Sequence, residues 1–188
     1  MVYIRNCRFN NYAKQLSVIF ANLKKLGMKK ITTLLLFSVI LLASCSKNDD
    51  NKSCGYTEST VVAPQSEINA VQAYLAINGI AATQHPSGFF YVIETPGTGA
   101  TAGLCNNVSV LYTGKLTNGT IFDQTTGTPA SFILGQLIIG WQKGLPLIKP
   151  GGKIKLYIPP SLGYGPNTNG PIPGNSILIF DMELKSVG

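Results

Sequence analysis

Apolar and polar residues alternate along five short segments of this 188-residue chain, all of them after residue 87. A period of two places every second side chain on the same face, so the alternation predicts half-buried β-strands rather than helices. The segments cover residues 88–94, 108–117, 130–134, 153–158 and 177–185. After the second of them, Asn118-Gly119 favours a tight hairpin turn, because both residues tolerate the backbone that such a turn requires.

One segment between these strands has helical spacing instead. Trp141, Leu145 and Ile148 share one face of a short predicted helix, and Pro150-Gly151-Gly152 ends it. The strands therefore have one short helix available to cover them. The sequence predicts an α+β domain over residues 88–188, in which a five- to six-stranded antiparallel sheet wraps around this helix.

A helical pattern also precedes the strands. Its apolar stripe predicts a helix over residues 65–78, with Asn78-Gly79 at its end. We expect residues 65–87 to form a short N-terminal helical extension of the domain. The turn sequence after it contains the only histidine, His85, which we interpret as a loop residue rather than a catalyst.

The positive charge of the chain is confined to its beginning. The formal net charge is +7, but 7 of the 15 Lys and Arg residues, and no acidic residue, fall within residues 1–44. From Cys45 onward 8 bases balance 8 acids. A nucleic-acid-binding domain needs an excess of positive charge on its own surface, so we expect no nucleic-acid partner.

Residues 28–44 follow the plan of a signal peptide. Met28-Lys29-Lys30 is followed by the 12-residue apolar run Ile31–Leu42. That run has the length of a signal-peptide core and is too short to span a bilayer, which takes about 20 residues. Leu42-Ala43-Ser44-Cys45 also resembles the bacterial lipobox, which implies cleavage before Cys45 and a lipid on its thiol. The alternatives are an ordinary signal peptide cut nearby and an uncleaved anchor.

The other segments before the domain are short. Residues 1–27 fit neither a signal peptide nor a domain, and we interpret them as an upstream extension from a wrongly chosen start codon, with Met28 the true start. Residues 45–64 are expected to be a tether between the lipid and the domain. A lipid at Cys45 predicts a protein of the bacterial cell envelope, anchored to the outer membrane and facing either the periplasm or the cell surface.

Four cysteines are present, and two remain once Cys7 in the upstream extension and Cys45 are set aside. Export places the domain in an oxidising compartment, where paired cysteines form disulfides. We therefore expect a disulfide between Cys54 and Cys105 that joins the tether to the domain. Two separate thiols are the alternative, because geometry decides whether the bond forms.

The sequence lacks the residues that most enzyme classes require. With a single histidine, placed in a loop, no Ser-His-Asp or Cys-His arrangement is plausible. The sequence also has no Cys-x-x-Cys and no His pair at the spacing of metal ligands. The Gly-rich stretches do not lead from a strand into a helix, as phosphate-binding loops do. Hydrolase, kinase and metalloenzyme functions are therefore excluded, and no cofactor is expected. What remains is a concentration of aromatic residues on or near the strands, which composition alone would explain as ordinary core.

Four motifs give these aromatic residues another meaning. They are Val110–Asp123 (VLYTGKLTNGTIFD), Phe132–Gly144 (FILGQLIIGWQKG), Gly152–Gly165 (GKIKLYIPPSLGYG) and Pro171–Leu184 (PIPGNSILIFDMEL). In content, order and spacing they resemble the FKBP family of peptidyl-prolyl cis-trans isomerases. The resemblance extends over almost all of residues 88–187. It implies an enzyme that speeds rotation about the peptide bond before proline.

The resemblance also implies a site, an apolar pocket for a proline ring with Trp141 as its floor. Tyr164 would offer its hydroxyl, and Ile138 its backbone N–H, to carbonyls of the bound peptide. Asp123 would lie at the pocket edge near Tyr112, with a purely structural hydrogen-bonded acid as the alternative. The residues implied as catalytic are Tyr112, Phe122, Asp123, Trp141, Tyr164 and Phe180, and those implied as substrate-binding are Phe132, Leu137, Ile138 and Ile172.

Such a pocket implies proline-containing polypeptides as partners and macrolides as further ligands, while the lipid would make the membrane a third partner. The expected role is folding assistance for exported proteins, whose Xaa-Pro bonds isomerise slowly. Two other functions are open: a non-catalytic module that holds proline-containing segments in the same cleft, and an envelope lipoprotein whose domain is only a spacer. The chain departs from the family pattern at Ala130, where many relatives carry a bulkier residue, so one wall is expected to be more open. Pro166 restricts the loop over residues 165–171.

Overall fold

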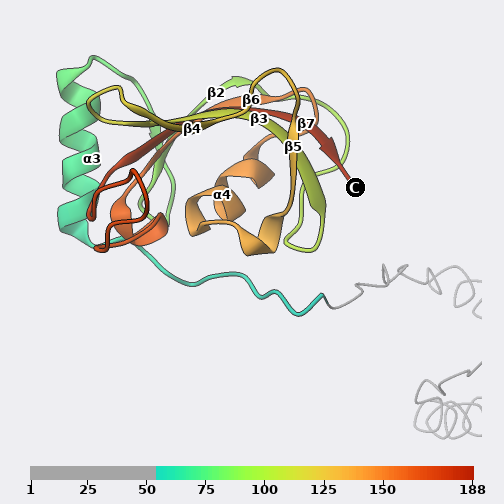
Figure 1. The fold of residues 1–188 in the computed structure, drawn as a ribbon, viewed down its shortest axis with the longest axis horizontal. Coiled ribbons are helices and arrows are strands. Elements are labelled where there is room, and N and C mark those ends of the chain that lie inside the picture. Colours follow the sequence, from blue (N-terminus) through green and yellow to red (C-terminus); the bar gives the residue numbers. More distant parts are fainter. Residues whose placement is uncertain (1–53) are drawn as a thin grey trace, which may run out of the picture. The chain divides into compact units, whose positions relative to one another are not determined.

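The structure is a computed structural model that describes residues 54–188 of the chain (Figure 1). The expectations for the upstream extension, the signal peptide, the lipid site at Cys45 and the tether up to residue 53 lie outside the described residues. Within residues 54–188, no helix combines the length and the apolar character that crossing a membrane requires.

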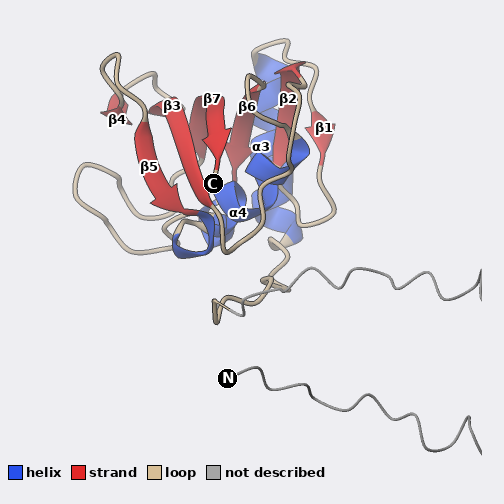
Figure 2. Ribbon diagram, turned by 90° about the vertical axis from the view of Figure 1, so that its right-hand side faces the viewer, coloured by secondary structure: helices blue, strands red, loops and turns tan. Residues whose placement is uncertain are grey.

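A seven-stranded antiparallel sheet forms the body of the described part (Figure 2). Its strand order is β1-β2-β6-β7-β3-β4, and β5 pairs with β3. The longest strands, β3 and β7, have 10 residues each and pair from Val108↔Val187 to Leu116↔Leu178, with one irregularity after Ser109. The predicted α+β class is confirmed. The strands are β1 (Thr83–Gln84), β2 (Phe90–Thr95), β3 (Asn107–Leu116), β4 (Ile121–Gln124), β5 (Ala130–Ile133), β6 (Lys153–Ile158) and β7 (Leu178–Val187).

The five strands expected from alternation are all present, and two more bring the number to seven. β1 has only two residues, both exposed, so no apolar alternation marks it. β4 follows the predicted Asn118-Gly119 turn, in which Gly119 has a φ of 87°. None of the four β4 residues is fully buried, and a strand without a buried face gives no hydrophobic pattern.

The helix around which the sheet wraps is α4 (Ile139–Gly144), which carries Trp141 (Figure 1). Its Gly140 faces β6 so closely that an added Cβ atom would lie 2.5 Å from Ile158 Cδ1. The absence of a side chain at Gly140 therefore lets the helix backbone approach the sheet, and Trp141 is buried, with 4% of its surface exposed. The short 3-10 turns on either side of α4 are η1 (Leu134–Gln136) and η2 (Leu145–Leu147).

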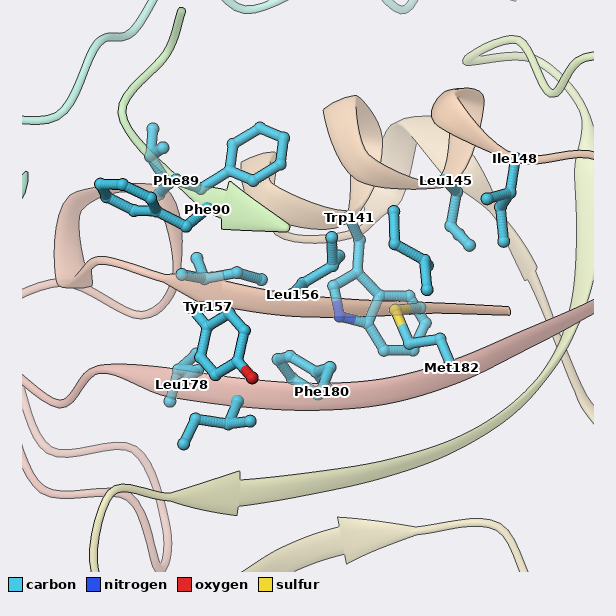
Figure 3. Packing of buried hydrophobic residues seen from close by; sticks show 14 of the residues in the cluster. Phe89, Phe90, Trp141, Leu145, Ile148, Leu156, Tyr157, Leu178, Phe180 and Met182 are labelled. Carbon is cyan, nitrogen blue, oxygen red and sulfur yellow. The ribbon is translucent and has the colours of Figure 1, made fainter. Parts of the chain in front are cut away.

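The core lies between α4 and the inward-facing residues of the strands (Figure 3). On β6 the alternation predicts Ile154, Leu156 and Ile158 as core, and each is at most 1% exposed. The same alternation places Tyr157 on the opposite face of β6, yet Tyr157 is only 3% exposed. Its ring lies 6.4 Å from that of Tyr74, so the N-terminal extension covers this part of the other face.

That extension consists mainly of α3 (Gln65–Ile77), which confirms the predicted helix to within one residue. It buries Ile68, Val71 and Leu75, the apolar stripe seen in the sequence. The Glu67 carboxylate accepts a hydrogen bond of 2.9 Å from the Ser161 N–H, which belongs to a further 3-10 turn, η3 (Pro160–Leu162). The extension is thus fixed to a turn that lies two residues before Tyr164.

Cys54 and Cys105 are joined by a disulfide, with their Cα atoms 5.6 Å apart. It links the first described residue to the loop between β2 and β3 across 51 residues of sequence. A bond that closes a loop of this size restricts the unfolded chain, and such bonds typically contribute about 2–4 kcal/mol to stability.

Candidate active site

Three aromatic side chains stand around Trp141 and form with it an open box. The rings of Tyr112, Phe132 and Phe180 lie 5.0, 6.1 and 5.1 Å from the Trp141 ring, measured between centroids. Their planes make angles of 81°, 86° and 87° with the indole plane. Edge-to-face contact is a favourable arrangement for aromatic rings, so the box holds its own shape. Figure 3 shows the Trp141 side chain extending from α4 toward Phe180 of β7.

The box encloses a cavity of about 110 Å³. A cavity of roughly 150 Å³ is known to hold benzene, so a five-membered ring matches the volume available here. One further strand residue and two loop segments complete the wall, and the strands β3, β4, β5 and β7 contribute to it. The lining residues are Tyr112 (β3), Asp123 (β4), Phe132 (β5), Leu137 and Ile138 (between η1 and α4), Trp141 (α4), Tyr164 (after η3) and Phe180 (β7).

The cavity gathers eight of the ten residues named from the sequence, but not Phe122 or Ile172. Phe122 packs edge-on against Phe180 with centroids 5.5 Å apart, so it supports the wall from one ring further out. Ile172 is 5% exposed and belongs to the buried core, where its backbone pairs with that of Asn169. Neither side chain therefore lines this cavity in the structure, and their expected roles at the site stay predictions.

The polar edge of the cavity is formed by two tyrosines and one acid. The Tyr112 hydroxyl donates a hydrogen bond of 2.6 Å to Asp123 Oδ2. Burial, then this hydrogen bond and the negative charge of Asp123, raise the pKa of Tyr112 well above its usual value. Burial and the same charge also raise the pKa of Tyr164. Both hydroxyls therefore stay protonated at neutral pH and are hydrogen-bond donors.

Two N–H groups of residues that line the cavity have no hydrogen-bond partner among residues 54–188. Among the hydrogen bonds of residues 54–188, none is donated by the Ile138 backbone N–H, which lies just before α4. The Trp141 Nε1 is buried and also has no partner within the described part of the chain. Buried donors without partners are uncommon in proteins, and they mark places where water or a ligand completes the bonding.

The structure also shows contacts that the sequence did not reveal. The Gln142 side-chain amide donates to the carbonyl oxygens of Leu137, at 2.7 Å, and of Gly135, at 3.2 Å. A polar residue on a short helix carries no sequence signal of such a role. His85 lies in a loop, as expected, and stacks on Phe89 with centroids 4.3 Å apart, while burial lowers its pKa. No cluster of potential metal ligands occurs among the described residues.

Comparison with known proteins decides the family. A family model described as FKBP-type peptidyl-prolyl cis-trans isomerase matches residues 99–185. A solved peptidyl-prolyl cis-trans isomerase from Pseudomonas syringae is 31% identical with a TM-score of 0.58, and the match covers 69% of this chain and 99% of that one. The chain belongs to the FKBP-type peptidyl-prolyl cis-trans isomerase family. The FKBP-like fold and the recognition of the four motifs are thereby confirmed.

Longer bacterial FKBP-type proteins are similar to the same region. The isomerase FkpA of Buchnera aphidicola is 45% identical over 120 residues, which are 62% of this chain and 47% of that protein. The crystal structure of FkpA from Escherichia coli is 38% identical, with a TM-score of 0.59, and the match covers 65% of this chain and 60% of that one. The outer membrane protein MIP of Legionella longbeachae is 45% identical over 105 residues, 54% of this chain and 45% of that protein. This chain thus spans about half the length of the FkpA and MIP sequences that it matches.

Proposed function

We propose that this protein is a peptidyl-prolyl cis-trans isomerase that acts on proline-containing polypeptides. The observation that carries the proposal is the aromatic box, an indole floor with three perpendicular ring walls around a cavity that fits a proline ring. Family membership supports it, because the family is one of isomerases.

The reaction needs neither a nucleophile nor a proton transfer. Rotation about the bond before proline is slow because amide resonance holds the bond planar, with a barrier of about 18–20 kcal/mol. Twisting the bond localises the nitrogen lone pair and lowers the dipole of the amide. An apolar cavity with little water therefore stabilises the twisted form relative to the planar one, which is preferential binding of the transition state. An acceleration of about 10⁵-fold requires roughly 7 kcal/mol.

In this proposal, polar groups at the rim orient the peptide. The Ile138 N–H and the Tyr164 hydroxyl donate to carbonyl groups on either side of the proline, while the ring rests on Trp141. The 2.6 Å hydrogen bond from Tyr112 fixes the Asp123 carboxylate at the edge of the cavity. Asp123 then acts through its charge and its position rather than as a base, since no proton moves in the reaction.

A refolding assay limited by proline isomerisation tests the activity. We expect the protein to accelerate refolding, and the acceleration to be lost when Trp141→Ala is combined with Tyr164→Phe or when a macrolide is added. Proline peptides that bind without any acceleration would instead indicate a module that only holds such segments. If neither peptide nor macrolide binds, the aromatic box is not a prolyl site.

We further propose that the protein works on exported polypeptides at the bacterial outer membrane, held there by a lipid on Cys45. The support is the lipobox-like sequence Leu42-Ala43-Ser44-Cys45 together with the similarity to MIP, a protein named for the outer membrane. Labelling cells with a radioactive fatty acid tests the anchor. Label should enter the wild-type protein and be absent from Cys45→Ala, and label that survives this substitution would refute it.

A further inference from the structure

The turn η1 determines where two cavity residues lie, because Leu137 and Ile138 follow it directly. The Ile138 N–H at the cavity can be aimed correctly only if this turn is held still. The contacts that hold it come partly from a segment far away in sequence, residues 54–58, which precedes the region matched by the family model at residues 99–185. We call residues 54–58 the strap.

The first contact is between the Tyr56 ring of the strap and Gly135 in the middle of η1. A Cβ atom added at Gly135 would overlap the Cγ and both Cδ atoms of the Tyr56 ring. The ring therefore lies directly on the Gly135 backbone, and it can do so only because position 135 has no side chain. Gly135 does not have a positive φ, so its close contact with Tyr56, rather than its backbone conformation, makes glycine necessary.

A second hold on η1 comes from the loop that carries Cys105. The Leu104 carbonyl accepts a hydrogen bond of 2.8 Å from the Gly135 N–H, and the Asn106 carbonyl accepts one of 3.1 Å from the Leu134 N–H. Cys105 lies between these two acceptors and is bonded to Cys54, two residues before Tyr56. The disulfide therefore joins the segment that bonds to η1 with the strap whose ring covers it.

We propose that Tyr56 is a positioning residue for the prolyl cavity. The Cys54–Cys105 disulfide anchors the strap, and the Tyr56 ring packs on Gly135 and keeps η1 in place. Leu137 and Ile138, which follow η1, are thereby held in the geometry that binds the peptide. The inference rests on the proposed function for its effect on substrate, but the hold on η1 can be measured without any activity. The hydroxyl plays no part, since the contact is made by the ring.

Hydrogen exchange on the complete, oxidised chain tests the hold directly. In Tyr56→Ala the exchange rates of the Gly135 and Leu137 amides should rise about tenfold, which corresponds to roughly 1.4 kcal/mol. Tyr56→Phe keeps the ring and should match the wild type. Gly135→Ala should reproduce Tyr56→Ala, because the added methyl group displaces the ring, and Cys54→Ser should give a smaller rise of the same amides.

The matched control is Glu58→Gln on the same strap. Glu58 forms an ion pair of 3.2 Å with Lys143 of α4, and within the described part of the chain no hydrogen bond or ion pair joins it to η1, so the exchange of the η1 amides should not change. Binding of a tetrapeptide with a central Leu-Pro bond is followed by the fluorescence of Trp141, the only tryptophan. Its Kd and the KM of the isomerase reaction should rise about tenfold in Tyr56→Ala with little change in kcat, because uniform binding is lost.

Two results would overturn the inference. The first is that the exchange rates of the η1 amides do not change in Tyr56→Ala. The second is that the exchange rates of core amides, such as those of Leu156 and Leu178, rise equally, which would indicate general destabilisation. If Tyr56→Ala does not fold, Gly135→Ala and Cys54→Ser decide by the same measurements. A wild-type protein without isomerase activity would refute the proposed function, and the exchange data would still confirm or refute the hold on η1.

Discussion

Replacing Gly140 with alanine should displace the floor of the prolyl cavity. The new Cβ atom would lie 2.5–2.8 Å from three atoms of the Ile158 side chain. Ordinary carbon contacts are about 3.5–4 Å, so α4 and β6 must move apart by roughly 1 Å. Trp141 is the next residue on α4 and moves with it. Misplacement by about 1 Å can cost roughly 10²-fold in rate, so kcat/KM for a Leu-Pro peptide should fall by between tenfold and about 10²-fold.

The loss of stability should be no larger than the loss of activity. Overpacking of a core costs about 1–3 kcal/mol, while alanine is favoured over glycine inside a helix by about 1 kcal/mol. The net loss in the free energy of unfolding should thus be about 0–2 kcal/mol, measured by urea titration. Combining Gly140→Ala with Ile158→Ala removes the clash, so the double variant should regain activity and show a strong favourable coupling. Full activity and unchanged Trp141 fluorescence in Gly140→Ala would refute the reasoning that this close contact positions the floor.

Three further outcomes follow from the site. Tyr112→Phe removes the hydrogen bond to the exposed Asp123 and should lower the free energy of unfolding by about 0.5–1.5 kcal/mol in urea titration; no loss would mean that water replaces the bond fully. The pKa values of Tyr112 and Tyr164 are raised above 10.0 in the folded protein, so these tyrosines lose their protons in the unfolded chain first. The free energy of unfolding should therefore fall as the pH rises above about 10, and it should fall less in Tyr112→Phe. A urea midpoint that does not change between about pH 9 and about pH 11 would contradict this. Glu67→Ala leaves the Ser161 N–H without its acceptor and should lower the free energy of unfolding by about 1–3 kcal/mol in the same titration. Glu67→Gln keeps an acceptor oxygen and should lower it less. Equal losses in the two variants would show that the charge of the carboxylate matters, rather than the presence of an acceptor.

Much of the fold was predictable because burial leaves a periodic trace in the sequence. The apolar stripe of α3 and the alternation along β6 gave helix and strand to within a residue or two. β1 and β4 left no such trace, since neither strand has a buried face. Tyr157 shows a second limit of periodicity, because a strand pattern cannot tell that another element, here α3, covers the outer face.

The motifs predicted which aromatic residues lie together around Trp141, but not which of them line the cavity. Trp141 and the rings around it belong to the motif segments, so the resemblance located them together. Phe122 packs on Phe180 and Ile172 lies in the core, so neither lines the cavity, and motif membership alone does not separate such neighbours from lining residues. The contact between Tyr56 and Gly135 was not foreseen, because it depends on a close approach between residues 79 positions apart.

Trp141 and Phe180 are at once walls of the cavity and members of the hydrophobic core, with exposed fractions of 4% and 3%. A substitution at either position therefore alters folding and ligand binding together, and such changes are rarely tolerated. Tyr164, at the rim of the cavity, is 41% exposed and is free of this double constraint. A new preference for the substrate residues around the proline should accordingly evolve by substitutions at the rim of the cavity, while the aromatic floor stays the same.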